Sequence, residues 1–575
     1  MKRRQSKPNA GARAAALLAT ACLTAAGCTT ALLRPGADER SLDELAAEET
    51  PLLSRYTHPF GLDYVKVEAI SLATGLHGTG SDPPPTPQRA ALLDKMGQEE
   101  VPNPNEVLES DDTALVLLRG FLPPGIQAGD RFDIEVQTPS RSTTSSLRNG
   151  WVLSTRMTEL AVLGGQVKSG HVIAACEGPV LVDPSTTGEE GDGYAVRGRI
   201  LGGGVATKTR PLGLVVTHEH RSPRLSQAIE NEVNLRFHHY DSGRKIGVAT
   251  AKTDEYIELQ VHERYRDNIG RFVRVVRSLA LGESAAERQQ RIARLETQLA
   301  DPLTAARASL RLEAIGDDQA VDVLIDGSES SDAEVRFYAA EALAYLDKTE
   351  AVGPLAEAIR NEPAFRANAL AALSTMDDVL AYDALRELLG AKSVETRYGA
   401  FRALWTMSSG DPLVQGERLG DQFSYHVLDV GGPDVVHVTR TFRPEIVLFG
   451  ADQRIKLPTV LDAGSQILVN GLHGDQVTVS RFVVGEQDQT RVVSTRIDDV
   501  VRAIVELGGT YPDVVQALQQ ARDDGALPSR LAVDALPQSG RRYDRAADEE
   551  VDPEDAGAAP YRLATPLPDL FSRKK

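Results

Sequence analysis

A pattern that recurs about every 30 residues constrains the fold of this chain more than any other feature. Within residues 301–409, four arginines are spaced 29, 30 and 31 residues apart, and each opens an Ala/Leu-rich stretch with helical periodicity. Second helices are expected around three leucines with a similar spacing: Leu324, Leu355 and Leu385. Because one helical hairpin cannot bury its own apolar face, we expect the hairpins to stack into an all-α solenoid.

These units resemble short HEAT-like repeats, and the resemblance implies an array that binds proteins and not substrates. Two interpretations of the repeated arginines stay open. They bridge successive repeats, or they contact a docked partner. The candidate partner-binding residues are Arg307, Arg336, Arg366 and Arg397.

The array interrupts a second pattern, which occupies residues 58–285 and resumes at residues 411–536. Alternation of apolar and charged residues predicts a half-buried strand at 131–136. Further strands are expected at 65–72, 114–118 and 180–182, and a helix is expected behind Ser222-Pro223, where Leu225, Ile229, Val233 and Phe237 recur every four residues. Strands that precede helices without regular alternation indicate an α+β fold.

The N-terminal sequence is typical of an export signal. Basic residues at positions 2–13 precede an apolar run at 14–23, and small residues then lead to Cys28. This end resembles a bacterial lipobox, which implies a signal peptide at 1–27, acylation of Cys28 and a tether at 28–57. An ordinary signal peptide cleaved nearby is the alternative. Thr29 is not the Asp that commonly retains lipoproteins at the inner membrane, so we expect a lipid anchor in the outer membrane.

The acidic composition excludes some classes of partner. The formal net charge is −19, which disfavours binding to nucleic acid. Several of the acidic residues lie among prolines and alanines within residues 537–575, so we predict a disordered tail there.

Few residues suggest chemistry. His218-Glu219-His220, expected on one strand face, and His238-His239 are the one grouping with metal-ligand character, and solvated polar positions are the alternative. Cys176 is expected to be a buried small hydrophobe. The sequence contains neither a phosphate-binding loop nor a nucleophile elbow. We therefore assign no catalytic, metal or cofactor-binding residue and do not expect an enzyme.

Several stretches of the two outer blocks resemble the flagellar basal-body P-ring protein family, in the family's order. They are Val67–Gly80, which ends in Gly75-Leu76-His77-Gly78-Thr79-Gly80, then Gly129–Val136, Ser145–Gly150, Ala228–Phe237, Pro444–Gly450 and Val500–Asp513. We expect their glycines to supply positive φ or close backbone approach, and 500–518 to form two short helices.

This resemblance implies a split P-ring-like α+β body, residues 58–285 with 411–536, into which the array of residues 286–410 is inserted. It also implies a structural subunit that assembles with itself into a ring around the flagellar rod in the periplasm, with rod and L-ring components as partners. Family members normally lack a lipid anchor and HEAT repeats. The alternative is therefore a lipid-anchored, non-flagellar outer-membrane scaffold that binds another envelope protein through the array.

Overall fold

The structure is a computed structural model that describes residues 50–163, 166–182, 195–543 and 561–570. Residues 52–575 form one compact unit, which is described below. The predicted signal peptide and Cys28 lie outside the described residues. None of the described helices is both long enough and apolar enough to cross a bilayer.

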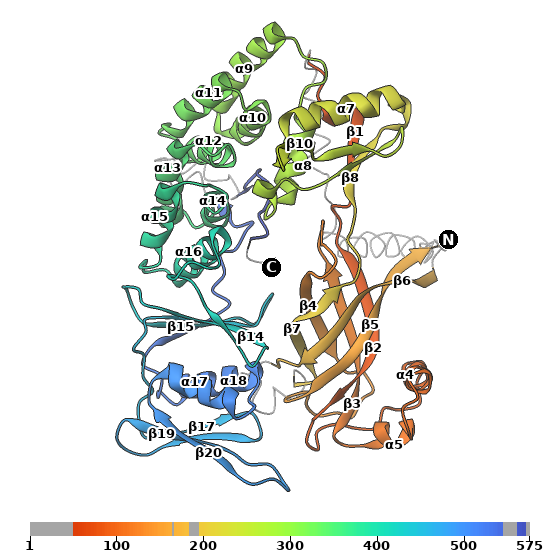
Figure 1. The fold of residues 1–575 in the computed structure, drawn as a ribbon, viewed down its shortest axis with the longest axis vertical. Coiled ribbons are helices and arrows are strands. Elements are labelled where there is room, and N and C mark those ends of the chain that lie inside the picture. The colour runs from red at the N-terminus through yellow and green to blue at the C-terminus, as the bar shows by residue number, and fades with distance from the viewer. Residues whose placement is uncertain (1–49, 164–165, 183–194, 544–560, 571–575) are drawn as a thin grey trace, which may run out of the picture. The chain divides into compact units, whose positions relative to one another are not determined.

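An antiparallel barrel forms the first part of the P-ring-like sequence (Figure 1). It closes in the order β2-β3-β4-β7-β6-β5, and its strands are β2 Val65–Thr74, β3 Thr113–Leu122, β4 Arg131–Gln137, β5 Trp151–Leu163, β6 Gln166–Pro179 and β7 Arg197–Ala206. The alternation predicted for 131–136 is confirmed, because Phe132, Ile134 and Val136 are buried in the barrel core. Two helices, α4 Pro87–Gln98 and α5 Pro104–Glu109, cover β2 and β3 through a small apolar cluster.

The strand expected at 180–182 is not formed. β6 ends at Pro179, which has no N–H for a ladder, and beyond it Leu181 makes a single isolated bridge to Arg199. The helix expected behind Ser222-Pro223 is confirmed as α7 Pro223–Arg236, and the Ser222 hydroxyl accepts a hydrogen bond from the N–H of Leu225 at 3.2 Å.

A small α/β region is built from segments on both sides of the barrel, residues 53–60 before it and residues 212–277 after it. Its sheet has the order β1-β8-β12-β11, and a separate hairpin pairs β9 with β10. Its elements are α3 Leu53–Tyr56, β1 Thr57–Phe60, β8 Leu212–Val216, η1 His218–His220, β9 His238–Asp241, β10 Arg244–Gly247, β11 Ala249–Ala251, β12 Tyr256–Leu259, η2 Glu263–Tyr265 and α8 Ile269–Arg277.

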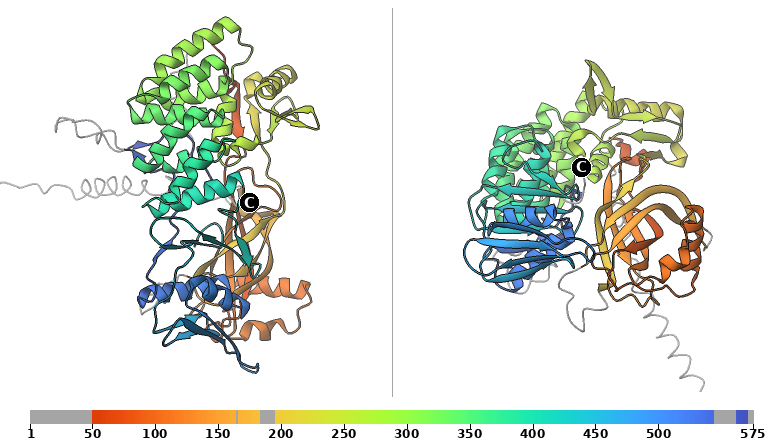
Figure 2. Two further views of the ribbon diagram at one scale, coloured as in Figure 1. Left: turned by 60° about the vertical axis from the view of Figure 1, so that its left-hand side comes forward. Right: turned by 60° about the horizontal axis from the view of Figure 1, so that its bottom comes forward.

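The repeats form a stack of helices, seen from two directions in Figure 2. The helices are α9 Ala285–Leu299, α10 Pro302–Ile315, α11 Asp318–Ser328, α12 Ala333–Tyr345, η3 Thr349–Ala351, α13 Val352–Asn361, α14 Arg366–Leu373, α15 Val379–Leu388 and α16 Val394–Met407. The first helices of the hairpins, α12 and α14 above all, are buried along nearly their whole length, whereas α11, α13 and α15 bury one face. A helix buried on all sides is covered by more than its hairpin partner.

The C-terminal block has two sheets and two helices (Figure 1). One sheet has the order β13-β14-β16-β15-β21, and the other has the order β17-β18-β19-β20. The elements are β13 Glu417–Leu419, β14 Phe423–Leu428, β15 Val435–Val438, β16 Glu445–Phe449, β17 Thr459–Ala463, β18 Ile467–Gly471, β19 Gln476–Arg481, β20 Gln489–Ser494, α17 Ile497–Glu506, α18 Tyr511–Asp523 and β21 Arg530–Val533.

The tail is not disordered throughout. β22 Arg542–Tyr543 pairs with β23 Tyr561–Arg562, and Leu563 and Leu570 are buried in the same apolar cluster as the repeats. The expectation of disorder is therefore wrong for residues 542–543 and 561–570. The acidic composition did not reveal that the leucines and prolines after residue 560 have an apolar surface to cover.

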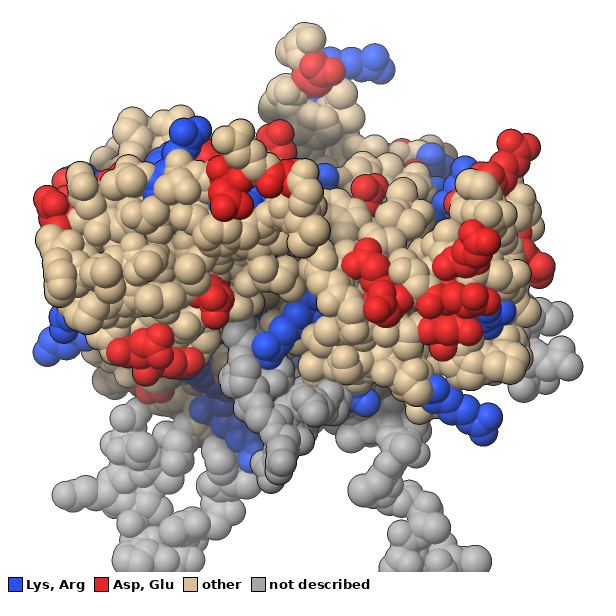
Figure 3. All heavy atoms as spheres, turned by 90° about the horizontal axis from the view of Figure 1, so that it is seen from below, with Lys and Arg blue, Asp and Glu red and all other residues tan. Residues whose placement is uncertain are grey.

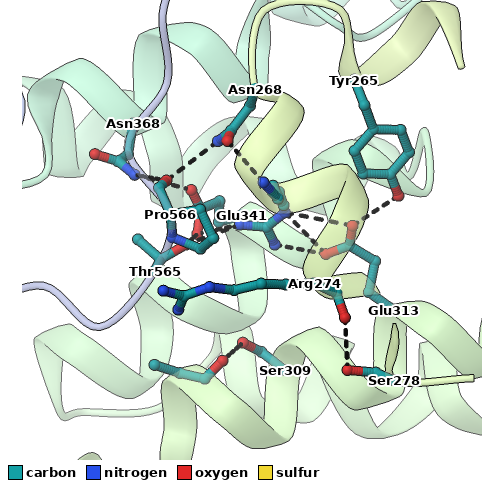
Figure 4. Close-up of polar contacts among 12 residues, drawn as sticks. Tyr265, Asn268, Arg274, Ser278, Ser309, Glu313, Glu341, Asn368, Thr565 and Pro566 are labelled. Atoms are coloured by element: carbon teal, nitrogen blue, oxygen red, sulfur yellow. Dashed lines mark hydrogen bonds and ion pairs between the residues drawn. The ribbon is translucent and has the colours of Figure 1, made fainter. Parts of the chain in front are cut away.

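A buried ionic cluster joins α8 to α10 and α12 of the array (Figure 4). Arg271, with no exposed side-chain surface, lies 2.5 Å from Glu313 of α10 and 2.6 Å from Glu341 of α12. Tyr265 donates its hydroxyl to Glu313 at 2.7 Å. Burial by itself lowers the pKa of Arg271, but the two carboxylates outweigh burial and raise it above the ordinary arginine value.

A second buried cluster joins α16 to the C-terminal sheet. Glu445 of β16 accepts hydrogen bonds from Tyr398 at 2.6 Å and from Arg402 at 3.0 Å. Burial by itself raises the pKa of Glu445, but Arg402 and Arg443 outweigh it and hold that pKa at about 2. The array is thus attached by paired charges at both of its ends.

Removing the cation of the first cluster is expected to destabilise the protein. Arg271→Met leaves two buried carboxylates without their counter-charge, so the free energy of unfolding should fall by about 3–5 kcal/mol in denaturant titrations. Arg360→Met removes an exposed pair with Glu387 in the same array and is the matched control, with a nearly unchanged unfolding free energy. Equal effects of the two substitutions would contradict the importance of the cluster.

His437 of β15 gives the fold a pH dependence. Burial lowers its pKa to about 4, and its Nε2 accepts a hydrogen bond from the N–H of Ala535 at 3.1 Å. His437 takes up a proton below about pH 6.5 in the unfolded chain but only below about pH 4 in the folded chain. The free energy of unfolding therefore falls by about 3 kcal/mol as the pH is lowered from about 6.5 to about 4.

His437→Gln keeps an acceptor but does not titrate, and it should flatten the dependence of the unfolding free energy on pH across this window. Substitution of the exposed His473 by Gln is the control. An unchanged slope in the His437 variant would show that other groups carry the pH dependence.

Candidate interaction surfaces

Three of the four repeated arginines bind the C-terminal ends of the helices that precede them. Arg336 donates to the carbonyl oxygen of Ser330 at 2.6 Å, just after α11. Arg366 donates to Ile359 of α13 at 3.1 Å, and Arg397 donates to Leu389, after α15, at 2.6 Å. Basic side chains satisfy helix-terminal carbonyl groups in this way. Arg307 occupies the corresponding position in α10 and is half-buried.

Two of these arginines also connect neighbouring elements. Arg366 lies 3.1 Å from Glu395 of the next repeat. Arg397 donates to the carbonyl oxygen of Gly431 at 3.1 Å, and its guanidinium lies 4.7 Å from the centre of the Phe449 ring. Arg397 is 1% exposed, so almost no surface is left for a partner. The geometry favours the structural interpretation, and partner binding by the four arginines stays a prediction.

The histidines do not form the arrangement expected from the sequence. Residues 218–220 form the 3-10 turn η1 and not a strand, so the prediction of two imidazoles on one strand face is wrong. The His220 Nδ1 atom lies 2.9 Å from the hydroxyl of Thr217, and its ring packs edge-on against Tyr56. His238 and His239 belong to β9. Within the described residues, no group of three or more His, Cys, Asp or Glu side chains could hold a metal ion.

Cys176 lies inside the barrel core, as predicted for a small hydrophobe. It is 2% exposed, and burial raises the pKa of its thiol to about 12. The protonated thiol is a poor nucleophile at neutral pH.

The glycine-rich stretch at 75–80 makes a tight turn after β2, as predicted. Gly75 and Gly78 have φ values of +77° and +89°. Gly80 meets the other requirement, close backbone approach, because an added Cβ would lie 2.2 Å from the carbonyl oxygen of Thr113.

This turn contacts the second stretch that carries the family resemblance. The N–H of Ser145 donates to the carbonyl oxygen of Thr79 at 3.0 Å, and the Thr79 hydroxyl donates to the carbonyl oxygen of Ser146 at 2.9 Å. Stretches 75–80 and 145–150 therefore form one unit at the end of the barrel. Sequence order did not reveal this contact between segments about 70 residues apart.

The two helices expected at 500–518 are confirmed as α17 and α18. Gly508, at φ +92°, follows α17, and Pro512 lies in the first turn of α18. The Asp513 carboxylate accepts a hydrogen bond from the N–H of Thr510 at 2.7 Å and closes a capping box.

The two outer blocks meet at these motifs. A cavity of about 160 Å³ is lined by His77 and Asn149 from the barrel end and by Gly508 and Asp513 from the α17–α18 connection. A neighbouring cavity of about 360 Å³ lies between β6–β7 and the start of α18, where Cys176 and Tyr511 are among the lining residues.

The junction contains no shared sheet. In the described ranges, every sheet draws its strands from one block alone, so the body is two folded parts in contact and not a single continuous sheet.

Exposed apolar side chains gather on the sheet β17–β20 and its loops. Five large hydrophobic residues there are between 49% and 104% exposed: Val460, Leu472, Phe482, Val484 and Val492. Figure 3 views the molecule from the end where this sheet lies in Figure 1, and broad parts of that face carry no charged side chain. β20 pairs with β19 on one side, and among the described residues no strand pairs with its other edge.

These features define a class: a protein that combines a β-barrel, a helical repeat array and a C-terminal block of two sheets. Residues 61–292 match the family model of the flagellar P-ring protein, and residues 321–405 match that of HEAT repeats. The chain therefore carries a P-ring protein region followed by HEAT repeats, and the resemblance is confirmed over these residues. No curated protein matches the chain. The first match ends before residue 411, so the resemblance of residues 411–536 stays a prediction.

A substitution at Gly80 tests the packing of the motif turn. Gly80→Ala forces its new Cβ against the backbone of Thr113 and should lower the free energy of unfolding by about 1–3 kcal/mol, measured in denaturant. Gly97→Ala in α4 is the control, because its Cβ meets no atom within 4 Å and alanine favours a helix. A Gly80 variant as stable as this control would contradict the close approach.

Proposed function

We infer that this protein is a structural subunit of the bacterial flagellar basal body, which assembles with itself into a P-ring-like ring around the rod in the periplasm. The observation that carries this inference is the match of residues 61–292 to the flagellar P-ring protein family. The P-ring family is a structural one, and the assembly, the location and the rod and L-ring partners follow from the resemblance.

The apolar face of β17–β20 supports self-association. Ring closure requires a head-to-tail interface between two different patches of the subunit. An exposed apolar sheet with an open edge strand is suited to one side of such an interface, because an open edge offers unpaired N–H and C=O groups to another chain. The sheet packs on an apolar core that it shares with α17 and α18.

The HEAT repeats suggest a second function, because ring closure by itself does not require a repeat array. We propose that they dock a second envelope component, and that a lipid at Cys28 anchors the chain to the outer membrane. If residues 61–292 do not assemble into a ring, the match of residues 321–405 to HEAT repeats favours the alternative, a lipid-anchored scaffold that acts through the array.

Ring assembly is testable with purified, detergent-solubilised protein. We expect a closed oligomer of uniform size by electron microscopy and analytical ultracentrifugation. Val492→Asp places a charge on the exposed face of the edge strand β20 and should shift the population to monomers. Val379→Asp, which adds the same charge at a 73% exposed site on α15 of the array, is the control and should still assemble. A monomer under all conditions for the unmodified chain would overturn the ring proposal.

A further inference from the structure

The last described residues of the chain lie in a site built from two distant parts of the sequence. After β23, residues 563–570 run past α12, α14 and the N-terminus of α8, as Figure 4 shows for Thr565 and Pro566. Leu563 and Leu570 are 7% and 2% exposed, whereas Leu567 between them is 48% exposed. The segment thus presents one side to the site and the other to the surroundings.

A threonine anchors the segment to the buried ionic cluster. The Thr565 hydroxyl accepts a hydrogen bond from Arg271 at 3.0 Å and donates one to Glu341 at 2.8 Å. Both charged side chains are at most 1% exposed. Hydrogen bonds to charged groups are stronger than bonds between neutral groups, and burial strengthens them further.

The backbone of the segment is recognised at its first proline. The carbonyl oxygen of Pro566 accepts a hydrogen bond from the side-chain amide of Asn268 and another from that of Asn368, both at 3.2 Å. Asn268 caps α8 and Asn368 belongs to α14, and each is 1% exposed. Two buried amides from separate elements therefore converge on one carbonyl group.

The composition of the segment suits an extended ligand. Pro566 and Pro568 are both buried and have no N–H group that burial would leave unpaired. Prolines also favour an extended backbone before binding, which reduces the entropy lost on binding. Residues 544–560 separate the segment in sequence from β22, and the hydrogen bonds described above are made by Thr565 and Pro566 themselves.

We propose that α8, α12 and α14 form a peptide-binding site for an extended segment with a Leu-x-Thr-Pro-Leu-Pro sequence, and that residues 563–570 are its exchangeable resident ligand. A second copy of this chain carries the same segment, and it is the partner that the site accepts in trans. The consequence of this inference rests on the proposed function: exchange of the segment links neighbouring subunits. Until it leaves, the resident segment covers α12 and α14 of the array.

The experiment uses the full chain, folded with its segment in place. A protease recognition sequence is inserted between Glu550 and Val551, the folded protein is cut, and a fluorescently labelled peptide of residues 559–572 is added. We expect the labelled peptide to replace the resident fragment and bind saturably, measured by fluorescence anisotropy. A peptide with Thr565→Val should bind about tenfold more weakly, because it keeps the shape and loses both hydrogen bonds.

Two further peptides are matched controls. Thr565→Ser keeps the hydroxyl and should bind like the unmodified sequence, and Leu567→Ala changes an exposed residue and should do the same. Equal affinity of the valine and serine peptides would overturn the assigned recognition. A cut protein that keeps its thermal stability but does not admit the labelled peptide would overturn exchange, as would a cut protein that unfolds. Because binding is read on single subunits, these outcomes are independent of whether the ring forms.

Discussion

The structure depends first on the pairing of one buried arginine with two buried glutamates. Arg271 comes from the region that matches the P-ring family, whereas Glu313 and Glu341 come from the repeat array. None of these charges could be buried alone, because removing a charge from water costs far more free energy than packing returns. The pairing therefore fixes α8 against the array, and the array is a part of the body and not a freely projecting arm.

Buried charged side chains also join the other end of the array to the C-terminal block and join the tail to the array. Glu445 needs Arg402 and Tyr398 of α16 to be buried, so the C-terminal sheet is joined to the last repeat. Thr565 enters the first cluster and brings the tail with it. As a result, the first helices of the hairpins are covered by other parts of the chain. This restricts docking of a partner to α11, α13 and α15 or to a site from which the resident segment has left.

Local patterns predicted local structure well in this chain. The repeat period predicted the helical array, the alternation at 131–136 predicted β4, and Ser222-Pro223 predicted the start of α7. The failures came where a short segment has no periodicity of its own. Residues 218–220 form a 3-10 turn, and residues 563–570 are ordered through contacts to helices about 200 to 300 residues earlier in the chain.

The sequence by itself determined the repeat array, the periodic strands and helices and the family resemblance of residues 61–292, because side-chain periodicity and turn glycines act over a few residues. Only the tertiary structure decided which elements meet. It brought the turn at 75–80 against residues 145–146 and, across a small cavity, opposite the α17–α18 connection, and it placed Thr565 between Arg271 and Glu341. Such contacts depend on burial and charge pairing between distant segments, which no local pattern encodes.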